Sequence, residues 1–185
     1  GGLKILDAAT MQQLNYNDDM RDQFSTKIDN IEVNGNLAYI VGESKQLYVV
    51  DLTSMQVVFQ TAAKGTRLLL HGDYLFSAST TDGLKVYDVS GENAMAPVVV
   101  KTLLPPADSA NGRTGGANVQ RVRIDGDHLY LMAEGGSARG VYCYSLSDVL
   151  ENDEPELKWF ACPEKKVYGG FIDVNGKEQA AVPLV

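Results

Sequence analysis

The sequence predicts an all-β protein built from a repeated antiparallel sheet of four strands. Short apolar runs rich in β-branched and aromatic residues recur along the 185-residue chain, and turn-forming residues separate them. The same order of run, turn and run returns in units of roughly 37 to 56 residues. No segment has a convincing 3.6-residue period, so we expect no substantial helix.

Each unit opens with a hairpin whose turn contains a glycine. The four turns are Asn34-Gly35, His71-Gly72, Asp125-Gly126 and Asn175-Gly176. Asn-Gly and Asp-Gly supply the positive φ that two-residue hairpin turns require. A second strand-like run follows each of the first three turns, so these segments predict paired first and second strands.

The third strand of each unit is a short apolar phrase that ends in aspartate. The phrase is Leu-Lys-Ile-Leu-Asp at 3–7, Leu-Tyr-Val-Val-Asp at 47–51 and Leu-Lys-Val-Tyr-Asp at 84–88, with a looser copy, Val-Tyr-Cys-Tyr-Ser, at 141–145. Sixteen residues separate Gly35 from Asp51, and sixteen separate Gly72 from Asp88. A fourth strand follows each phrase, at 11–14, 55–59, 98–100 and 157–160.

Four antiparallel strands per repeat are the signature of β-propeller blades. We expect one propeller domain over 1–185 with about four blade equivalents, three of them complete at 27–63, 66–104 and 118–163. The fourth is split between 1–16 and 169–185, because the last hairpin has no third strand after it. A four-stranded sheet cannot bury both faces alone, and packing blade on blade buries them.

Three arrangements fit a blade split between the ends of the chain. The chain closes on itself as a four-bladed ring, or two chains form a homodimer that completes a larger ring, or the sequence is an excerpt of a longer propeller. If the chain wraps around, the separation from Gly176 to Asp7 is again sixteen residues.

The Leu-Lys-Ile-Leu-Asp, Leu-Tyr-Val-Val-Asp and Leu-Lys-Val-Tyr-Asp phrases resemble the LVIVD repeat, as does the Gly-Asn-Leu-Ala-Tyr-Ile-Val stretch at 35–41. The resemblance covers nearly the whole chain and implies a β-propeller of bacterial or archaeal secreted or cell-surface proteins. It implies no catalytic residues, since the motif is structural. Blade three departs from the pattern, with Ser145 in place of the aspartate. WD40 repeats are a weaker match, because their Gly-His and Trp-Asp signature is missing.

Composition excludes several function classes. The formal net charge of −8 argues against a nucleic-acid partner, which would need a basic face. No apolar run approaches the ~20 residues of a membrane-spanning helix. Two histidines and two cysteines favour neither a metal site nor a cofactor, and we expect none. Cys143 is expected in the core, and a cross-strand disulfide to Cys162 stays an alternative.

The recurring aspartates Asp7, Asp51 and Asp88 are interpreted as structural, each bonding backbone N–H groups in the following turn. His71 and His128 are expected to be solvated turn residues. The stretch 148–156 is expected to be a solvated loop.

The candidate ligand site lies in two loops expected on one rim of the propeller. The connection 104–118 is unusually long and Gly-rich, as is the loop at 135–139, yet neither matches a phosphate-binding motif. The candidate ligand-binding residues are Asp108, Asn111, Arg113, Glu134 and Arg139. Two arginines over a central depression suit a carboxylate or a sulfated sugar, although solvated loop arginines are the simpler interpretation.

Two functions remain open. The favoured one is a non-enzymatic binding or scaffold propeller of the cell surface or secretome, with a protein or glycan ligand. The alternative is a hydrolase or lyase acting on carbohydrate or another anionic substrate, with Asp108 and Glu134 as the acid–base pair.

Overall fold

A computed structural model describes residues 3–16, 27–105, 117–134, 139–162, 171–174 and 177–180. It confirms the all-β prediction and the three complete blades, in each of which four strands pair antiparallel in chain order. Blade one contains β3 (Ile28–Asn34), β4 (Leu37–Gly42), β5 (Gln46–Asp51) and β6 (Gln56–Ala62). Blade two contains β7 (Arg67–His71), β8 (Tyr74–Ala78), β9 (Leu84–Asp88) and β10 (Val98–Leu103). Blade three contains β11 (Asn118–Asp125), β12 (His128–Glu134), β13 (Gly140–Ser145) and β14 (Leu157–Cys162).

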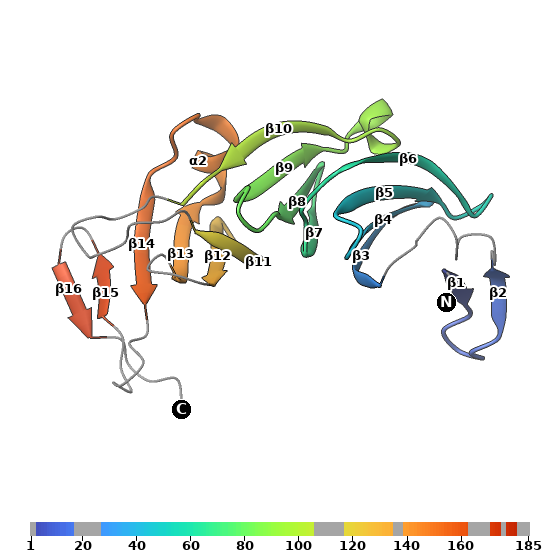
Figure 1. Cartoon of the computed structure of the whole chain (residues 1–185), viewed down its shortest axis with the longest axis horizontal. Coiled ribbons are helices and arrows are strands. Elements are labelled where there is room, and N and C mark those ends of the chain that lie inside the picture. The colour runs from blue at the N-terminus through green and yellow to red at the C-terminus, as the bar shows by residue number, and fades with distance from the viewer. Residues whose placement is uncertain are drawn as a thin grey trace.

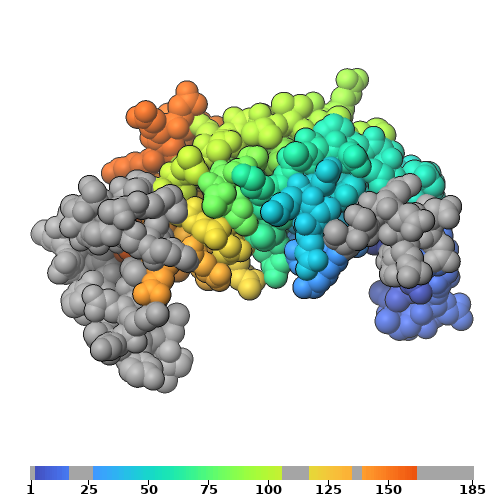
Figure 2. Space-filling view, viewed as in Figure 1, coloured from blue at the N-terminus to red at the C-terminus, as the bar shows by residue number. Residues whose placement is uncertain are grey.

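The blades fan out into an open arch (Figure 1). The first strands, β3, β7 and β11, lie toward its concave side, while β6 and β10 run along its convex side. In the space-filling view the described residues of the three blades form one continuous body (Figure 2).

The two halves of the predicted split blade lie at opposite ends of the arch (Figure 1). The N-terminal half is the two-stranded sheet of β1 (Lys4–Leu6) and β2 (Gln13–Tyr16). The C-terminal half is the hairpin of β15 (Phe171–Val174) and β16 (Lys177–Ala180), and β15 continues the sheet of blade three by pairing with β14. The two halves therefore do not join within one chain, and the described structure is not a closed four-bladed ring.

The predicted hairpin turns are confirmed by their backbone. Gly35, Gly72 and Gly126 have φ of +56°, +57° and +56°. A β-carbon would meet no atom within 4 Å at any of them, so conformation rather than crowding selects glycine.

The hydrophobic core lies between the blades, as the repeat predicted. Successive side chains of the third strand point alternately toward the blade on one side and the blade on the other. In β5, Leu47 and Val49 pack toward blade two with Leu75 and Tyr87, while Val50 packs on the other face with Ile5 of β1. In β9, Leu84 and Val86 pack toward Leu129 and Tyr142 of blade three. Both faces of blades one and two are thus buried.

Hydrogen bonds also join adjacent blades. Thr80, in the loop before β9, forms a two-way backbone bridge with Val119 of β11, at 2.9 Å in each direction. The buried Tyr39 hydroxyl of β4 donates to the Ala94 carbonyl at 3.0 Å, at the end of the short 3-10 helix η1 (Gly91–Ala94) of blade two.

Blade three differs from the sequence expectation in one element. The six-residue helix α2 (Leu146–Glu151) includes the first four residues of the stretch 148–156, which the sequence predicts to be a solvated loop. Ser145 caps it by accepting a hydrogen bond from the Asp148 backbone N–H, and Leu146 and Val149 are buried against blade three. Two apolar anchors are too few to give a periodic signal in the sequence.

Cys143 is a free thiol with no exposed surface, which confirms its expected core position. It faces Trp159 across the ladder of β13 and β14. The alternative of a disulfide to Cys162 is therefore wrong.

Candidate functional site

The strand order gives the arch two rims. The turn between the first and second strands of each blade and the turn between the third and fourth strands lie at the same end of the sheet. In blade one these are 34–37 and 51–56, and this end is here called the hairpin rim. The loops between second and third strands, and the connections between blades, lie at the other end, here called the loop rim. Of the predicted site residues, Glu134 and Arg139 lie at the loop rim.

The hairpin rim is acidic. No Lys or Arg occurs in its turns at 7–12, 34–37, 51–56, 71–74, 88–98, 125–128 and 145–157. Its carboxylates are those of Asp7, Asp51, Asp73, Asp88, Glu92, Asp125, Asp127, Asp148, Glu151, Asp153, Glu154 and Glu156.

The repeat-ending aspartates of this rim are structural, as interpreted from the sequence. Asp51 accepts hydrogen bonds from the Thr53 N–H at 2.9 Å and the Ser54 hydroxyl at 2.8 Å. Asp88 accepts from the Ser90 N–H at 2.8 Å, and Asp7 accepts from the Thr10 N–H at 2.7 Å.

These bonds to the charged form hold the pKa of each of the three carboxyls below its usual value. The largest cause is the Thr53 backbone N–H for Asp51, the Ser90 side chain for Asp88 and the Thr10 backbone N–H for Asp7. The recurring acids are thus occupied in closing turns.

The loop rim, in contrast, holds several cations. They are Lys27, Lys45, Lys64, Arg67, Lys85 and Arg139. Lys27, Lys45 and Lys64 are exposed, and Arg139 is half-buried just before β13. Sequence reasoning missed all but Arg139, although counting strands from each turn glycine places every one of them at this end.

Some of these cations are engaged with the protein itself. Asp82 accepts from Lys64 at 2.7 Å and from Lys85 at 3.3 Å, and the Lys64 ammonium is the main reason that the pKa of Asp82 is lowered. The Arg67 guanidinium donates to the Thr66 carbonyl at 2.7 Å and to the Asp29 carbonyl at 3.3 Å, tying blade two to blade one.

Of the predicted site residues, the structure describes Glu134 and Arg139. Glu134 is exposed at the end of β12, and Arg139 precedes Gly140, whose ladder partner is Ala133. The two residues therefore flank the same loop on the same rim. The other three candidates, Asp108, Asn111 and Arg113, lie outside the described residues, so their convergence stays a prediction.

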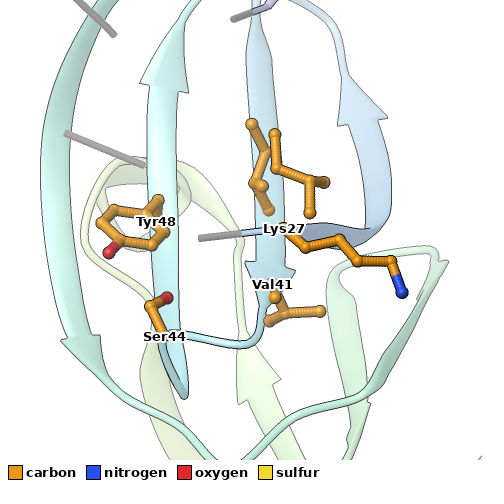
Figure 3. A pocket seen from close by; sticks show the side chains of 7 residues that line it. Lys27, Val41, Ser44 and Tyr48 are labelled. Atoms are coloured by element: carbon orange, nitrogen blue, oxygen red, sulfur yellow. The ribbon is translucent and has the colours of Figure 1, made fainter. Parts of the chain in front are cut away.

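A shallow groove of about 160 Å³ lies on the loop rim of blade one (Figure 3). Ile28, Ile40 and Val41 contribute apolar walls. Tyr48 and Ser44 lie on one side, and the Lys27 ammonium points away from them (Figure 3). This volume includes open solvent, and the groove encloses no space for even a water molecule, so it is a surface depression and not a small-molecule pocket.

Other candidate chemistry is confined to the surface or absent from the described chain. His71 and His128 are exposed, as expected, and the His128 ring stacks on Tyr130 at a centroid distance of 6.2 Å. Within the described segments, no three His, Cys, Asp or Glu side chains gather as a metal site would require. The described helices include none long and apolar enough to cross a membrane.

Comparison with protein families finds one match. The LVIVD repeat model matches residues 27–59, which span β3, β4 and β5 and the start of β6. This is the blade whose sequence carries the resemblance most completely. No curated protein matches the sequence.

Three solved structures with a similar fold are longer than this chain. The computationally designed Ika8 protein is 11% identical, with a TM-score of 0.55 over 98% of this chain and 52% of its own. The β-propeller domain of Cps50 (Swd1) from Myceliophteria thermophila is 9% identical, with a TM-score of 0.53 over 89% and 57%. The dihydro-heme d1 dehydrogenase NirN is 14% identical, with a TM-score of 0.56 over 98% and 41%. The chain thus spans about half the length of these structures, and the likeness establishes the propeller fold alone.

Proposed function

We propose that this chain, which carries an LVIVD repeat and is built from β-propeller blades, is a non-enzymatic binding or scaffold protein of the bacterial cell surface or secretome. The recurring polar residues support this proposal. Asp7, Asp51 and Asp88 each accept a hydrogen bond from the turn that follows, so these repeated carboxylates hold the turns in place and are not available as reactive groups.

The ligand is proposed to be a protein or glycan that carries anionic groups and contacts the loop rim. The separation of charge between the rims carries this proposal. On a chain of net charge −8, the turns of the hairpin rim carry carboxylates and no cation. The loop rim carries six cations against the carboxylates of Asp29, Glu43, Asp82 and Glu134, so it is the rim more favourable to an anion. Arg139 is the guanidinium proposed to bind a carboxylate or sulfate, since it lies on the loop rim just before β13 and has no ion pair among the described residues.

The shape of the described rim supports surface recognition. Its shallow groove encloses no space for a small ligand, so a ligand would contact the surface of several loops at once. Many weak contacts of this kind are typical of protein and glycan partners rather than of a small enclosed substrate.

The proposal is tested by a glycan-array screen, followed by titration of any hit with wild type and two variants. Arg139→Ala should weaken binding about tenfold, because a charge-assisted hydrogen bond is lost, and added salt should weaken binding further. Arg123→Ala is the matched control, since Arg123 is an exposed arginine in β11 away from the loop rim, and it should bind as wild type does. Equal binding by Arg139→Ala and wild type would overturn the rim assignment.

The same panel separates binding from catalysis. Each hit is incubated with the protein and its products are measured by mass spectrometry. Unchanged ligand is the expected result. Turnover that disappears in Glu134→Gln would overturn the non-enzymatic proposal in favour of a hydrolase or lyase that uses Glu134 as acid or base.

A further inference from the structure

The outer strand of blade two exposes a continuous apolar strip on the convex side of the arch (Figure 1). Val98, Val99 and Val100 of β10 are 49%, 48% and 50% exposed, and Met95, just before the strand, is 52% exposed. These four residues are here called the valine strip. In Figure 2 this part of the chain lies at the outer surface of the arch. Blade two packs against a described blade on each of its faces, so the strip is not a face that awaits a neighbouring blade.

The equivalent strands of the other blades carry polar residues at their exposed positions. In β6 these include Gln56 and Gln60 beside Val58, and in β14 the exposed residue is Lys158. Charged residues, lysine above all, commonly protect outer strands from contact with other chains. β10 lacks this protection, because its one charged residue, Lys101, has a side chain that is only 11% exposed.

Val58, Val100 and Lys158 occupy the same position in their three blades. Each has no ladder partner, because the register between the third and fourth strands shifts at that residue. Such a bulge shortens the backbone edge with which another strand can pair. The exposed side chains of the valine strip, rather than a long backbone ladder, are therefore the main contact that β10 offers.

Carboxylates lie near both ends of the valine strip. Glu92 is exposed in η1, and its carbonyl accepts a hydrogen bond from the Met95 N–H at 3.3 Å. Beyond Val100, the Lys101 ammonium donates to the Asp153 carboxylate at 3.2 Å. This contact brings the acidic segment that follows α2 beside β10, as the ribbon view also shows (Figure 1).

The charge near the two ends of the strip is negative after this ion pair is counted. Lys101 neutralises Asp153, whereas Glu92, Glu151 and Glu154 are exposed and have no ion pair among the described residues. An exposed apolar patch with carboxylates at its ends favours a partner that carries apolar residues between cations. A second copy of this chain fits less well, because its own net charge is −8.

We propose that the valine strip binds an extended segment of another protein in which apolar side chains lie between lysines or arginines. The apolar side chains cover the three valines and Met95, while the cations lie beside Glu92 at one end and beside Glu151 and Glu154 at the other. β10 has six residues and is therefore about 20 Å long, so about six residues of extended chain span it. This surface and its cationic ligand are separate from the loop rim and the anionic ligand proposed there.

Fluorescence anisotropy with three sets of labelled synthetic peptides tests the proposal. The first set alternates valine and threonine between pairs of lysines. The second set has glutamates in place of the lysines, and the third has glycine and serine in place of the valine and threonine. We expect only the first set to bind, and we expect added salt to weaken its binding.

Variants locate the binding on the protein. Val100→Lys should weaken binding of the first set about tenfold, because it removes an apolar contact and sets a cation against the peptide. Lys158 shows that a blade accommodates lysine at this position. Val58→Lys is the matched control, since it adds the same charge at the equivalent position of blade one, and it should bind as wild type does. Val99→Thr keeps a β-branched side chain and should weaken binding in the same direction. Far-UV circular dichroism checks that each variant is folded.

Several results would overturn the proposal. Binding by none of the three sets would show that the strip is not a peptide site. Equal binding by the first and second sets would remove the role of the carboxylates, and equal binding by the first and third would remove the role of the valines. Binding that Val100→Lys and Val99→Thr leave intact, or that Val58→Lys weakens as much as Val100→Lys does, would place the peptide elsewhere. No anionic ligand enters these measurements, so their failure leaves the proposed function untouched.

Discussion

Asp127 and Ser145 make in blade three the contact that Asn36 and Asp51 make in blade one, with the carboxylate moved to the other partner. The Ser145 hydroxyl donates to Asp127 at 2.7 Å, and the Asn36 amide donates to Asp51. Asp127 also accepts from the Ser147 N–H at 2.9 Å, as Asp51 accepts from the Thr53 N–H. The departure of blade three from the repeat pattern is thus compensated within the blade.

This exchange predicts a reciprocal rescue. Ser145→Asp alone should lower the melting temperature, because it sets a second carboxylate against Asp127. Asp127→Asn alone should lower it too, since an amide is a weaker acceptor for the Ser147 N–H. The double variant recreates the pair of blade one and should melt close to wild type, as measured by differential scanning calorimetry. Additive losses in the double variant would show that the two positions are not coupled.

The same geometry shows what sequence reasoning could and could not predict. The turn glycines and the repeat-ending aspartates predicted the blades and the structural role of Asp51, because the turns in which they occur depend on local backbone conformation. The role of Asp127 was missed although its position just after Gly126 matches that of Asn36 after Gly35. Its function depends on pairing with a residue eighteen positions away, which no local pattern encodes.

The candidate site was less predictable for a similar reason. Which residues share a rim follows from strand order, so the placement of Glu134 and Arg139 at one loop was accessible from sequence. The cations of other blades, such as Lys27 and Lys45, join that rim only when blades are laid side by side. The helix α2 also escaped prediction, because it depends on the Ser145 cap and burial against blade three.

The repeat-ending aspartates, which accept hydrogen bonds from the turns that follow them, predict a loss of stability in acid. The pKa of Asp51 is lowered in the folded chain, so its contribution is present above the unfolded pKa of about 3.9 and is lost as pH falls through the lower folded value. The free energy of unfolding from urea titrations should therefore drop between pH 5 and pH 3. Asp51→Asn should show a smaller drop, while Asp125→Asn, at an exposed aspartate in the hairpin turn of blade three, should match wild type. Equal drops in all three proteins would contradict the role given to Asp51.

Two buried tyrosines predict opposite responses to the same substitution. The Tyr144 hydroxyl has no hydrogen-bond partner among the described residues, whereas the Tyr39 hydroxyl donates to Ala94 at 3.0 Å. Burial raises the pKa of both, so both stay neutral. Tyr144→Phe should raise the free energy of unfolding by about 1 kcal/mol, and Tyr39→Phe should lower it by about 1 kcal/mol, in urea titrations. Destabilisation by Tyr144→Phe would show that its hydroxyl is bonded in solution.

Titration of an anionic hit from the glycan array tests most directly whether the loop rim binds the ligand. We expect Arg139→Ala to weaken binding about tenfold and Arg123→Ala to bind as wild type does. Equal binding by wild type and Arg139→Ala would contradict the account.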